Sequence, residues 1–351
     1  MTAKFKLASN GLLAGAFFIL SAVGANASSF YEGKTLSLIV ANAPGGGYDA
    51  NARVLARYMP RYIPGNPTIV VKNMPGAGGL AAANHMFSRE APDGLTFALL
   101  SRSTPLQPLM GVEAARFKSE DFTWLGTASS YADNAYFLIT MAGTPYKTAE
   151  DLKKKNTEKP AQFGGLAAGG TDTDIVLLAK EVLKFNINLV RGYKASADIG
   201  IAMERGEIDG RSIGWAALQI GSYANYVKEG KLNYLVQFGR ETRWPKMAHV
   251  PTARELAPTP EDRALIELVE FPLQITYPFV APPNVPKDRA EILQKAFMQT
   301  FKDPDYLAEA EKLGFDVSPL DGQKVKSMLA KAAQTPPSVI QRYKDLLEPP
   351  N

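Results

Sequence analysis

Pro44-Gly-Gly-Gly-Tyr-Asp49 is the stretch of sequence that decides the fold. An apolar run at residues 36–41 precedes it, and apolar side chains at helical spacing follow it over residues 54–62. A buried strand, a glycine loop and an amphipathic helix in this order form the basic unit of an open α/β sheet. The stretch therefore predicts an α/β protein with this loop at the carboxyl end of a strand.

The same unit recurs along the chain. A predicted strand at 68–71 leads through the loop at 75–79 into a helix at 80–87. A short strand at 162–165, the loop at 168–174 and another helix repeat the plan. Strands that alternate with helices predict a parallel, doubly wound sheet.

The pattern starts afresh near residue 135, which predicts a second lobe. Further strands are expected at 95–100, 135–140, 187–190, 208–213, 232–238 and 271–281, with helices after Thr148, Ser196, Trp215, Pro286, Asp303 and Leu320. The expected domains are a signal peptide at 1–27, the first part of lobe 1 at 28–135, lobe 2 at 136–240, and a return to lobe 1 with C-terminal helices at 241–351.

The composition excludes several classes of chemistry. The chain has 351 residues, no cysteine and two histidines, His85 and His249, that lie far apart in sequence. Thiolate metal sites and cysteine nucleophiles are therefore excluded, and no metal or cofactor is expected. Without residues 1–27 the chain has 37 basic and 35 acidic side chains, a balance that predicts no nucleic-acid partner.

The first residues read as a secretory signal peptide. Lys4 and Lys6 form a positive start, an apolar run from Leu12 to Val23 is too short to cross a bilayer, and Ala25-Asn-Ala27 is a cleavage motif. We expect cleavage after Ala27 and export of the rest.

Three glycine loops predict a site for an anion. Glycine loops between a strand and a helix expose N–H groups at the positive end of the helix dipole. The residues are Gly45, Gly46 and Gly47 in the first loop, Gly76, Ala77, Gly78 and Gly79 in the second, and Gly169 and Gly170 in the third. We expect these backbone N–H groups to dominate carboxylate binding, with Arg102 in a secondary role.

Other side chains beside the loops have local interpretations. Asp49 and Asp174 begin helices, where a carboxylate most often satisfies nearby N–H groups. The aromatic side chains Tyr48, Tyr131, Tyr193 and Trp215 are candidates for the walls of the site. Arg53, Arg57 and Arg61 recur every four residues and are expected to face solvent.

Residues 76–81 also match the dinucleotide pattern G-x-G-x-x-A. The following strand should then end in an acidic residue, yet it ends in Leu100-Ser-Arg-Ser103, which argues against a nucleotide site. The common P-loop, hydrolase and zinc-protease motifs are missing from the sequence.

Several motifs in order resemble one protein family. They are Pro44-Gly-Gly-Gly-Tyr-Asp49 with Arg53, Asn73-Met-Pro-Gly-Ala-Gly-Gly79, Ala91-Pro-Asp-Gly-Leu-Thr96, Asp121-Phe-Thr-Trp124, Gly206-Glu-Ile-Asp209, Val250-Pro-Thr252 and Ala281-Pro-Pro-Asn-Val-Pro286. From about residue 33 to the C-terminus the chain resembles the substrate-binding receptors of tripartite tricarboxylate transporters, also called the Bug family.

The resemblance implies a type II periplasmic-binding-protein fold with a hinge and a ligand cleft between two α/β lobes. It implies that backbone groups of residues 45–49 and 76–79 hold a ligand carboxylate, with Gly169, Gly170, Thr171 and Asp209 contributing from lobe 2. Arg102, Ser103, Ser129 and Tyr193 complete the predicted site. Two stretches depart from the family pattern, Val190-Arg-Gly-Tyr-Lys-Ala195 and Ser101-Arg-Ser-Thr104, so the ligand is free to differ from that of other members.

The function implied is capture of a small organic carboxylate in the periplasm and its delivery to one large and one small membrane subunit. We expect a monomer that closes over its ligand by a hinge motion and performs no catalysis. Two alternatives stay open: a receptor that reports its ligand to a membrane kinase, and an exported lyase or hydrolase. For the enzyme, the sequence offers no acid–base pair.

Overall fold

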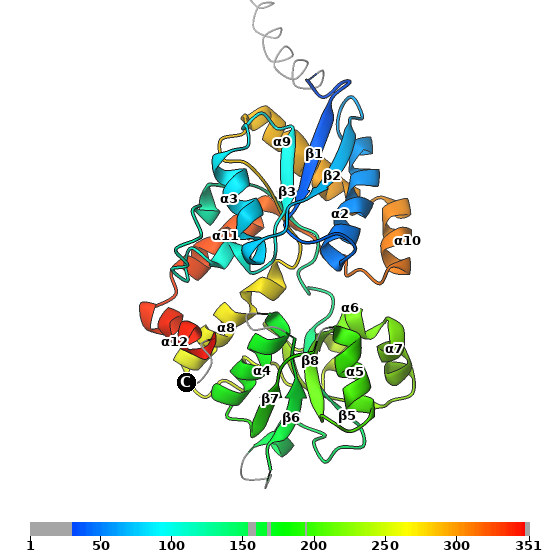
Figure 1. The fold of residues 1–351 in the computed structure, drawn as a ribbon, viewed down its shortest axis with the longest axis vertical. Helices are drawn as coiled ribbons and strands as arrows, with labels where there is room; N and C mark the ends of the chain where they lie inside the picture. Colours follow the sequence, from blue (N-terminus) through cyan, green and yellow to red (C-terminus); the bar gives the residue numbers. More distant parts are fainter. Residues whose placement is uncertain (1–29, 154–158, 167–169, 194, 348–351) are drawn as a thin grey trace, which may run out of the picture.

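The protein forms two lobes, one above the other in Figure 1, and each lobe is built around its own sheet. The computed structural model describes residues 30–153, 159–166, 170–193 and 195–347. The predicted signal peptide lies outside the described residues.

The sheet of lobe 1 has six strands in the order β11-β4-β10-β3-β1-β2. They are β1 (Thr35–Val40), β2 (Thr68–Asn73), β3 (Thr96–Leu99), β4 (Thr123–Thr127), β10 (Pro278–Ala281) and β11 (Leu320–Asp321). Strand β1 runs parallel to β2 and β3, whereas β10 is antiparallel to both β3 and β4.

The sheet of lobe 2 has five strands in the order β7-β6-β8-β5-β9. They are β5 (Tyr136–Met141), β6 (Ala161–Gly164), β7 (Ile187–Val190), β8 (Gly210–Gly214) and β9 (Leu232–Phe238). Strand β6 is parallel to β7 and β8, and β5 is antiparallel to β8 and β9.

Both sheets share one strand order, which confirms the fold class. In lobe 1 the order reads β2-β1-β3-β10-β4, and in lobe 2 it reads β7-β6-β8-β5-β9. Leaving out the strand that enters from the other lobe, each order is second, first, third and fourth strand of that lobe, with the entering strand between third and fourth. The entering strands are β5 and β10, and they run antiparallel to their neighbours. The sheets are therefore mixed, where the local pattern predicted parallel strands throughout.

Helices cover both faces of each sheet (Figure 1). In lobe 1 one face carries α2 (Gly47–Tyr58), α9 (Lys287–Thr300) and α10 (Pro304–Lys312), and the other carries α3 (Leu80–Ser88) and α11 (Gly322–Ala333). In lobe 2 one face carries α5 (Ser196–Glu204), α6 (Trp215–Leu218) and α7 (Gly221–Lys228), and the other carries α4 (Thr171–Glu181), α8 (Pro260–Gln274) and α12 (Pro337–Leu347).

Burial on both faces explains why β1 reads as a continuous apolar run. Leu36, Leu38 and Val40 pack in the core beneath α2 and α9, whereas Ile39 packs in the core on the other face. Successive side chains of a strand point to opposite faces, so a strand between two helical layers is apolar at every position.

The predicted strand at 271–281 is wrong over its first half. Phe271 lies in the last turn of α8, and the strand there is only β10. The Thr259 hydroxyl accepts a hydrogen bond from the Asp262 N–H, and Pro260 opens the helix. These are ordinary start signals for a helix, and the sequence analysis missed them.

Helix α12 lies against α4 and α8 of lobe 2. It follows α11 of lobe 1, so the chain passes between the lobes once more near its end. The domain boundaries expected from the sequence stay predictions.

The row of arginines at 53, 57 and 61 is exposed, as expected, and two of its members also form ion pairs with residues at or near α10. Arg57 of α2 pairs with Glu309, and Arg61, in the turn after α2, pairs with Asp303 and Asp305 at 3.0 and 2.9 Å. These side chains stay about half exposed, at 54% and 49%.

Two crossings, at residues 128–135 and 275–277, lie side by side between the lobes. The Ala128 N–H donates to the Tyr277 carbonyl oxygen at 3.0 Å, and the Thr276 N–H donates to the Ser129 carbonyl oxygen at 3.0 Å. The Arg240 Nη1 donates to three carbonyl oxygens of the first crossing, those of Tyr131, Ala132 and Asn134. The crossings thus form one hydrogen-bonded hinge.

Candidate functional site

The lobes face one another across the edges at which their parallel strands end. These strand ends are Val40, Asn73 and Leu99 in lobe 1 and Gly164 and Gly214 in lobe 2. The hinge joins the same two edges, since the antiparallel strands begin there: Pro278 pairs with Thr127 and Tyr136 pairs with Gly214. Open α/β sheets bind ligands outside the carboxyl ends of their strands, so this is the expected position of the site.

Asp49 holds the first glycine loop in place. Its carboxylate accepts hydrogen bonds from the Gly45 N–H, Arg53 Nε and Asn73 Nδ2, each at 2.9 Å. The hydrogen bond from Arg53 is the largest cause that lowers the pKa of Asp49 to about 2. Because its oxygens are used inside the loop, Asp49 orients the loop.

The first loop presents free N–H groups at the start of α2. Gly46 is the N-cap of α2 and Gly47 is its first residue. Among the described residues, no hydrogen bond uses the N–H of Gly46 or Gly47. A Cβ on Gly46 would meet only the Ala43 carbonyl oxygen, at 4.0 Å, and one on Gly47 would lie 3.6 Å from the Tyr277 hydroxyl, so Gly46 has open space beside it.

The second loop is left-handed and packs against residues 101–104, which follow β3. The φ angles of Ala77, Gly78 and Gly79 are 46°, 63° and 99°. A Cβ on Gly79 would lie 2.7 Å from Thr104 Oγ1 and 2.8 Å from Ser101 Oγ, so only glycine fits there. Gly78 is exposed and faces open space.

Arg102 carries a free charge between the lobes. Its side chain is partly buried, and in the described part of the chain no hydrogen bond or ion pair uses its guanidinium. Its backbone N–H donates to the Tyr48 hydroxyl at 3.1 Å. A partly buried cation without a partner is costly, which makes this group a candidate for binding an anion.

Four tyrosines surround Arg102. Tyr48 packs edge-on against Tyr277 with ring centroids 5.1 Å apart, and Tyr131 packs edge-on against Tyr136 at 5.9 Å. Burial acts to lower the pKa of Arg102, but electrostatic interactions with these tyrosines raise it above its usual range. The guanidinium therefore stays charged among aromatic walls from both lobes.

Lobe 2 contributes the start of α4. Gly170 is the N-cap and Thr171 is the first residue, whereas Gly169 lies outside the described residues. The Asp172 Oδ2 accepts the Leu166 N–H at 2.9 Å, and Asp174 Oδ1 is buried without a partner among the described residues.

The carboxyl group of Asp174, in the first turn of α4, interacts electrostatically with charges in both lobes. Burial, and next the charge of Asp172, raise the pKa of Asp174 to about 7. The Tyr343 hydroxyl, at 3.5 Å from Oδ2, and the charges of Arg102 and Arg191 act to lower it. Arg102 of lobe 1 therefore lies close enough to act on the pKa of a carboxyl group at the start of α4.

The remaining predicted residues differ in position. Ser103 lies in the segment that follows β3, and Tyr193 packs beside Gly164 at the end of β6. The Ser129 hydroxyl donates to Asp316 within the hinge. Asp209 lies at the opposite edge of its sheet, because it precedes β8 and its carboxylate accepts the Gln162 N–H at 2.7 Å. The described members of the predicted site thus lie at the facing edges of the two lobes or in the hinge, with Asp209 apart from them at the opposite edge.

The sequence analysis missed Tyr136 and Tyr277. Each lies where a strand enters from the other lobe, and the antiparallel direction of that strand places its first residues at the site. A local pattern of apolar residues carries no signal for strand direction. Only the hinge topology reveals these two residues.

A cavity of about 580 Å³ lies elsewhere, between α8, α11 and the hinge. Residues of all three parts line it, among them Ser130, Phe271, Gln274 and Met328, and none of the predicted site residues does.

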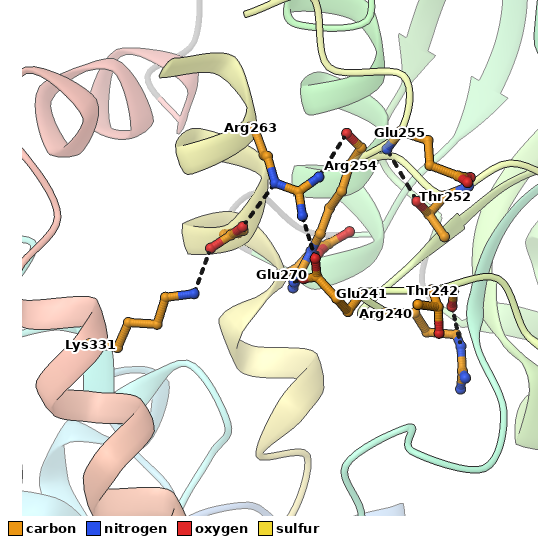
Figure 2. Close-up of polar contacts among 10 residues, drawn as sticks. Arg240, Glu241, Thr242, Thr252, Arg254, Glu255, Arg263, Glu270 and Lys331 are labelled. Carbon is orange, nitrogen blue, oxygen red and sulfur yellow. Dashed lines mark hydrogen bonds and ion pairs between the residues drawn. The ribbon is translucent and has the colours of Figure 1, made fainter. Parts of the chain in front are cut away.

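Six side chains beside this cavity form an ion chain of alternating charge, drawn in Figure 2: Glu270, Arg254, Glu241, Arg263, Glu267 and Lys331. Its ends are closed by short contacts, Arg254 Nε to Glu270 Oε2 at 2.7 Å and Lys331 Nζ to Glu267 Oε2 at 2.9 Å. Every charge in the ion chain already has a partner, so we place the candidate site at the glycine loops and Arg102.

Among the described residues, no group of three or more histidine, aspartate or glutamate side chains is arranged to hold a metal ion. No helix in this part of the chain is both long and apolar enough to cross a membrane.

Comparison with known proteins gives consistent family matches. Residues 52–344 match the model of the tripartite tricarboxylate transporter family receptor. The UPF0065 protein in the gbd 5' region of Cupriavidus necator is 24% identical over 314 residues, which are 88% of this chain and 87% of that protein.

Solved structures share the fold. A TctC solute-binding protein from Polaromonas, without ligand, superposes with a TM-score of 0.68 at 19% identity and covers 90% of this chain and 99% of its own. MatC from Rhodopseudomonas palustris with bound malate has a TM-score of 0.54 at 22% identity, with 90% of this chain and 99% of that chain covered. The matching family model is that of a transporter receptor, and the Polaromonas structure is that of a solute-binding protein, so neither describes an enzyme.

Proposed function

The chain belongs to the tripartite tricarboxylate transporter receptor family, and we propose that it captures a small organic carboxylate in the periplasm and delivers it to the membrane subunits of such a transporter. Malate bound to MatC, a protein of the same fold, supports a carboxylate as the ligand. The apolar N-terminal run with its Ala25-Asn-Ala27 motif supports export with cleavage after Ala27. We propose that the exported protein acts as a monomer.

The observation that carries this proposal is the free guanidinium of Arg102 between the lobes. In our proposal the carboxylate lies against Arg102 and the N–H groups of Gly46 and Gly47, with the second loop beside it. A charged hydrogen bond of this kind contributes about 1.5–3 kcal/mol, and a bidentate arginine pair also fixes orientation. Residues 170–171 would reach the ligand from lobe 2.

We also propose that ligand binding closes the lobes. Only a conformation in which both edges approach the ligand satisfies contacts from lobe 1 and lobe 2 together. The hydrogen-bonded crossings at 128–135 and 275–277 give the motion an axis.

A thermal-shift screen with mono-, di- and tricarboxylates tests the function. A ligand that binds only the folded protein raises its melting temperature by mass action. We expect at least one carboxylate to do so, and sugars and amines to have no effect. A shift with sugars or amines alone would refute the proposal.

Gly46→Asp tests the position of the site. Because φ at Gly46 is −89° and the space there is open, this variant should fold and yet place a carboxylate in front of the ligand. The matched control is Gly143→Asp, at a turn where a Cβ also meets no atom within 4 Å. We expect the thermal shift to disappear in Gly46→Asp and to persist in Gly143→Asp; a full shift in both variants would exclude this site.

A further inference from the structure

Tyr277 is held in the hinge by both of its backbone groups. Its N–H donates to Thr127 Oγ1 at 3.2 Å, and its carbonyl oxygen accepts a hydrogen bond from the Ala128 N–H at 3.0 Å. Both partners lie on the chain that forms the first crossing. The position of this residue is therefore set by the contact between the two crossings.

The side chain of Tyr277 extends from the hinge to the first glycine loop. Its ring packs edge-on against Tyr48 with centroids 5.1 Å apart, and its hydroxyl oxygen lies 3.6 Å from the position that a Cβ on Gly47 would take. Standard bond lengths then place this oxygen no more than about 6 Å from the Gly47 nitrogen. A residue of the hinge thus lies beside the start of α2.

The Tyr277 hydroxyl is an unused donor. No hydrogen bond among the described residues uses it, and its oxygen is not one of the fully enclosed polar atoms without a partner, so it keeps contact with solvent. Burial is the largest cause that raises the pKa of Tyr277 to about 12. The hydroxyl therefore keeps its proton at neutral pH and is able to donate.

The free N–H groups of Gly46 and Gly47 point toward the same space as this hydroxyl. N–H groups at the start of a helix point out of its N-terminal end, and each Cα–Cβ bond of a helix is tilted toward that end. An oxygen atom beside the Cβ position of Gly47 therefore lies on the side to which the N–H groups point. A carboxylate that accepts hydrogen bonds of about 3 Å from two donors joins groups about 6 Å apart.

From this arrangement we propose that the Tyr277 hydroxyl donates a hydrogen bond to the carboxylate at the start of α2. The inference rests on the proposed function and adds to its site a ligand contact that comes from the hinge itself. One residue then belongs to both the hinge and the binding site. Because the hinge sets the position of Tyr277, the contact stabilises those hinge conformations that keep the hydroxyl beside Gly47.

Tyr277→Phe is the informative variant, because it removes one oxygen atom and keeps the ring. Calorimetric titration with malate, adipate, citrate and benzoate measures the affinity. We expect every probe that binds the unmodified protein to bind the variant about tenfold or more weakly, since a hydrogen bond to a charged group is lost. The melting temperature without ligand should stay unchanged, because the hydroxyl has no partner among the described residues.

Tyr306→Phe is the matched control. The Tyr306 hydroxyl, in α10, also lacks a partner among the described residues, but it is fully enclosed and therefore cannot touch a ligand. Its removal takes away the same atom outside the site. We expect all four probes to bind this variant as they bind the unmodified protein.

The outcomes separate this inference from the proposed function. A loss of affinity below about threefold in Tyr277→Phe would overturn the inference and leave the proposed function in place. An equal loss in Tyr306→Phe would also overturn it, and so would a loss that comes with a lower melting temperature without ligand, because the hydroxyl would then act on the fold. No binding of any carboxylate by the unmodified protein would refute the proposed function itself.

Discussion

The ion chain beside α8 and the Arg102 site are both rich in charge, and they differ in one respect. In the ion chain every cation has a carboxylate partner within the protein (Figure 2). At the other site Arg102 has none among the described residues. The paired charges serve the folded state, whereas the unpaired charge is a cost that the proposed ligand would remove.

This difference separates stability from binding. A functional site is recognised less by the number of its charges than by those that the fold leaves unsatisfied. The large cavity beside the ion chain is the weaker candidate for a ligand site, because its charged residues Arg254 and Glu267 already form ion pairs. Variants in the two regions should therefore change different measurements.

Arg254→Ala should give the largest effect, on stability. The Arg254 side chain is 6% exposed and contacts both Glu270 and Glu241. Its removal leaves the Glu270 carboxylate buried without a cation, which costs about 3–5 kcal/mol. Urea unfolding measures this loss, and calorimetry on the folded fraction should give unchanged ligand affinity. A large loss of affinity with unchanged stability would break the comparison.

Arg102→Ala should have the opposite profile. Loss of a charged hydrogen bond lowers ligand affinity by about 1.5–3 kcal/mol, or roughly 10- to 150-fold. Stability should stay constant or rise slightly, since the free cation is removed. The exposed Arg205→Ala is a control for loss of one positive charge. A loss below tenfold would return the main role to the backbone N–H groups, as the sequence alone had suggested.

The pH dependence of stability should be the smallest effect. Burial raises the pKa of Glu270 from 4.5 to about 7, although Arg254 acts against it. The folded state then binds this proton more tightly than the unfolded state, so stability falls as pH rises from about 4.5 to about 7. We expect a loss of about 2 kcal/mol between pH 5 and pH 7.5, measured by urea unfolding.

Glu270→Gln sharpens the pH prediction, because it removes the titrating group and should flatten the slope. Asp174 also has a pKa raised to about 7 by burial and contributes in the same direction. Asp174→Asn should therefore also reduce the fall of stability with pH. Stability that rises with pH in the unmodified protein would contradict the assignment of both groups.

Much of the fold was predictable from the sequence, because strand, glycine loop and helix follow one another in a short span. The stretch around Pro44 placed β1 to within one residue and predicted the helix that follows, although α2 ends at Tyr58 and residues 59–62 form a 3-10 turn. Helix α8 was missed, since an expected strand covered its last turn and the start signals at Thr259 and Pro260 were overlooked.

The candidate site was predictable only in part. Glycine loops carry a local signal, and the structure places residues 45–49 and 76–79 at one edge. No local pattern predicts that the Arg102 guanidinium has no partner. That depends on how four tyrosines from the two lobes pack around it. The prediction for Asp209 was wrong although its strand was recognised. Strand β8 runs toward the site, so Asp209, which precedes it, lies at the opposite edge of the sheet.

The shared strand order has a consequence for the route by which the chain folds. In lobe 1 the strands β3 and β4 are separated by β10, which begins only at Pro278, after all of β5 to β9. Contacts between distant segments form slowly, because a long loop must close before they contribute. The sheet of lobe 2 is built from one continuous segment, Tyr136 to Phe238, and has no such delay. The lobe that starts the chain is therefore the later of the two to complete its sheet.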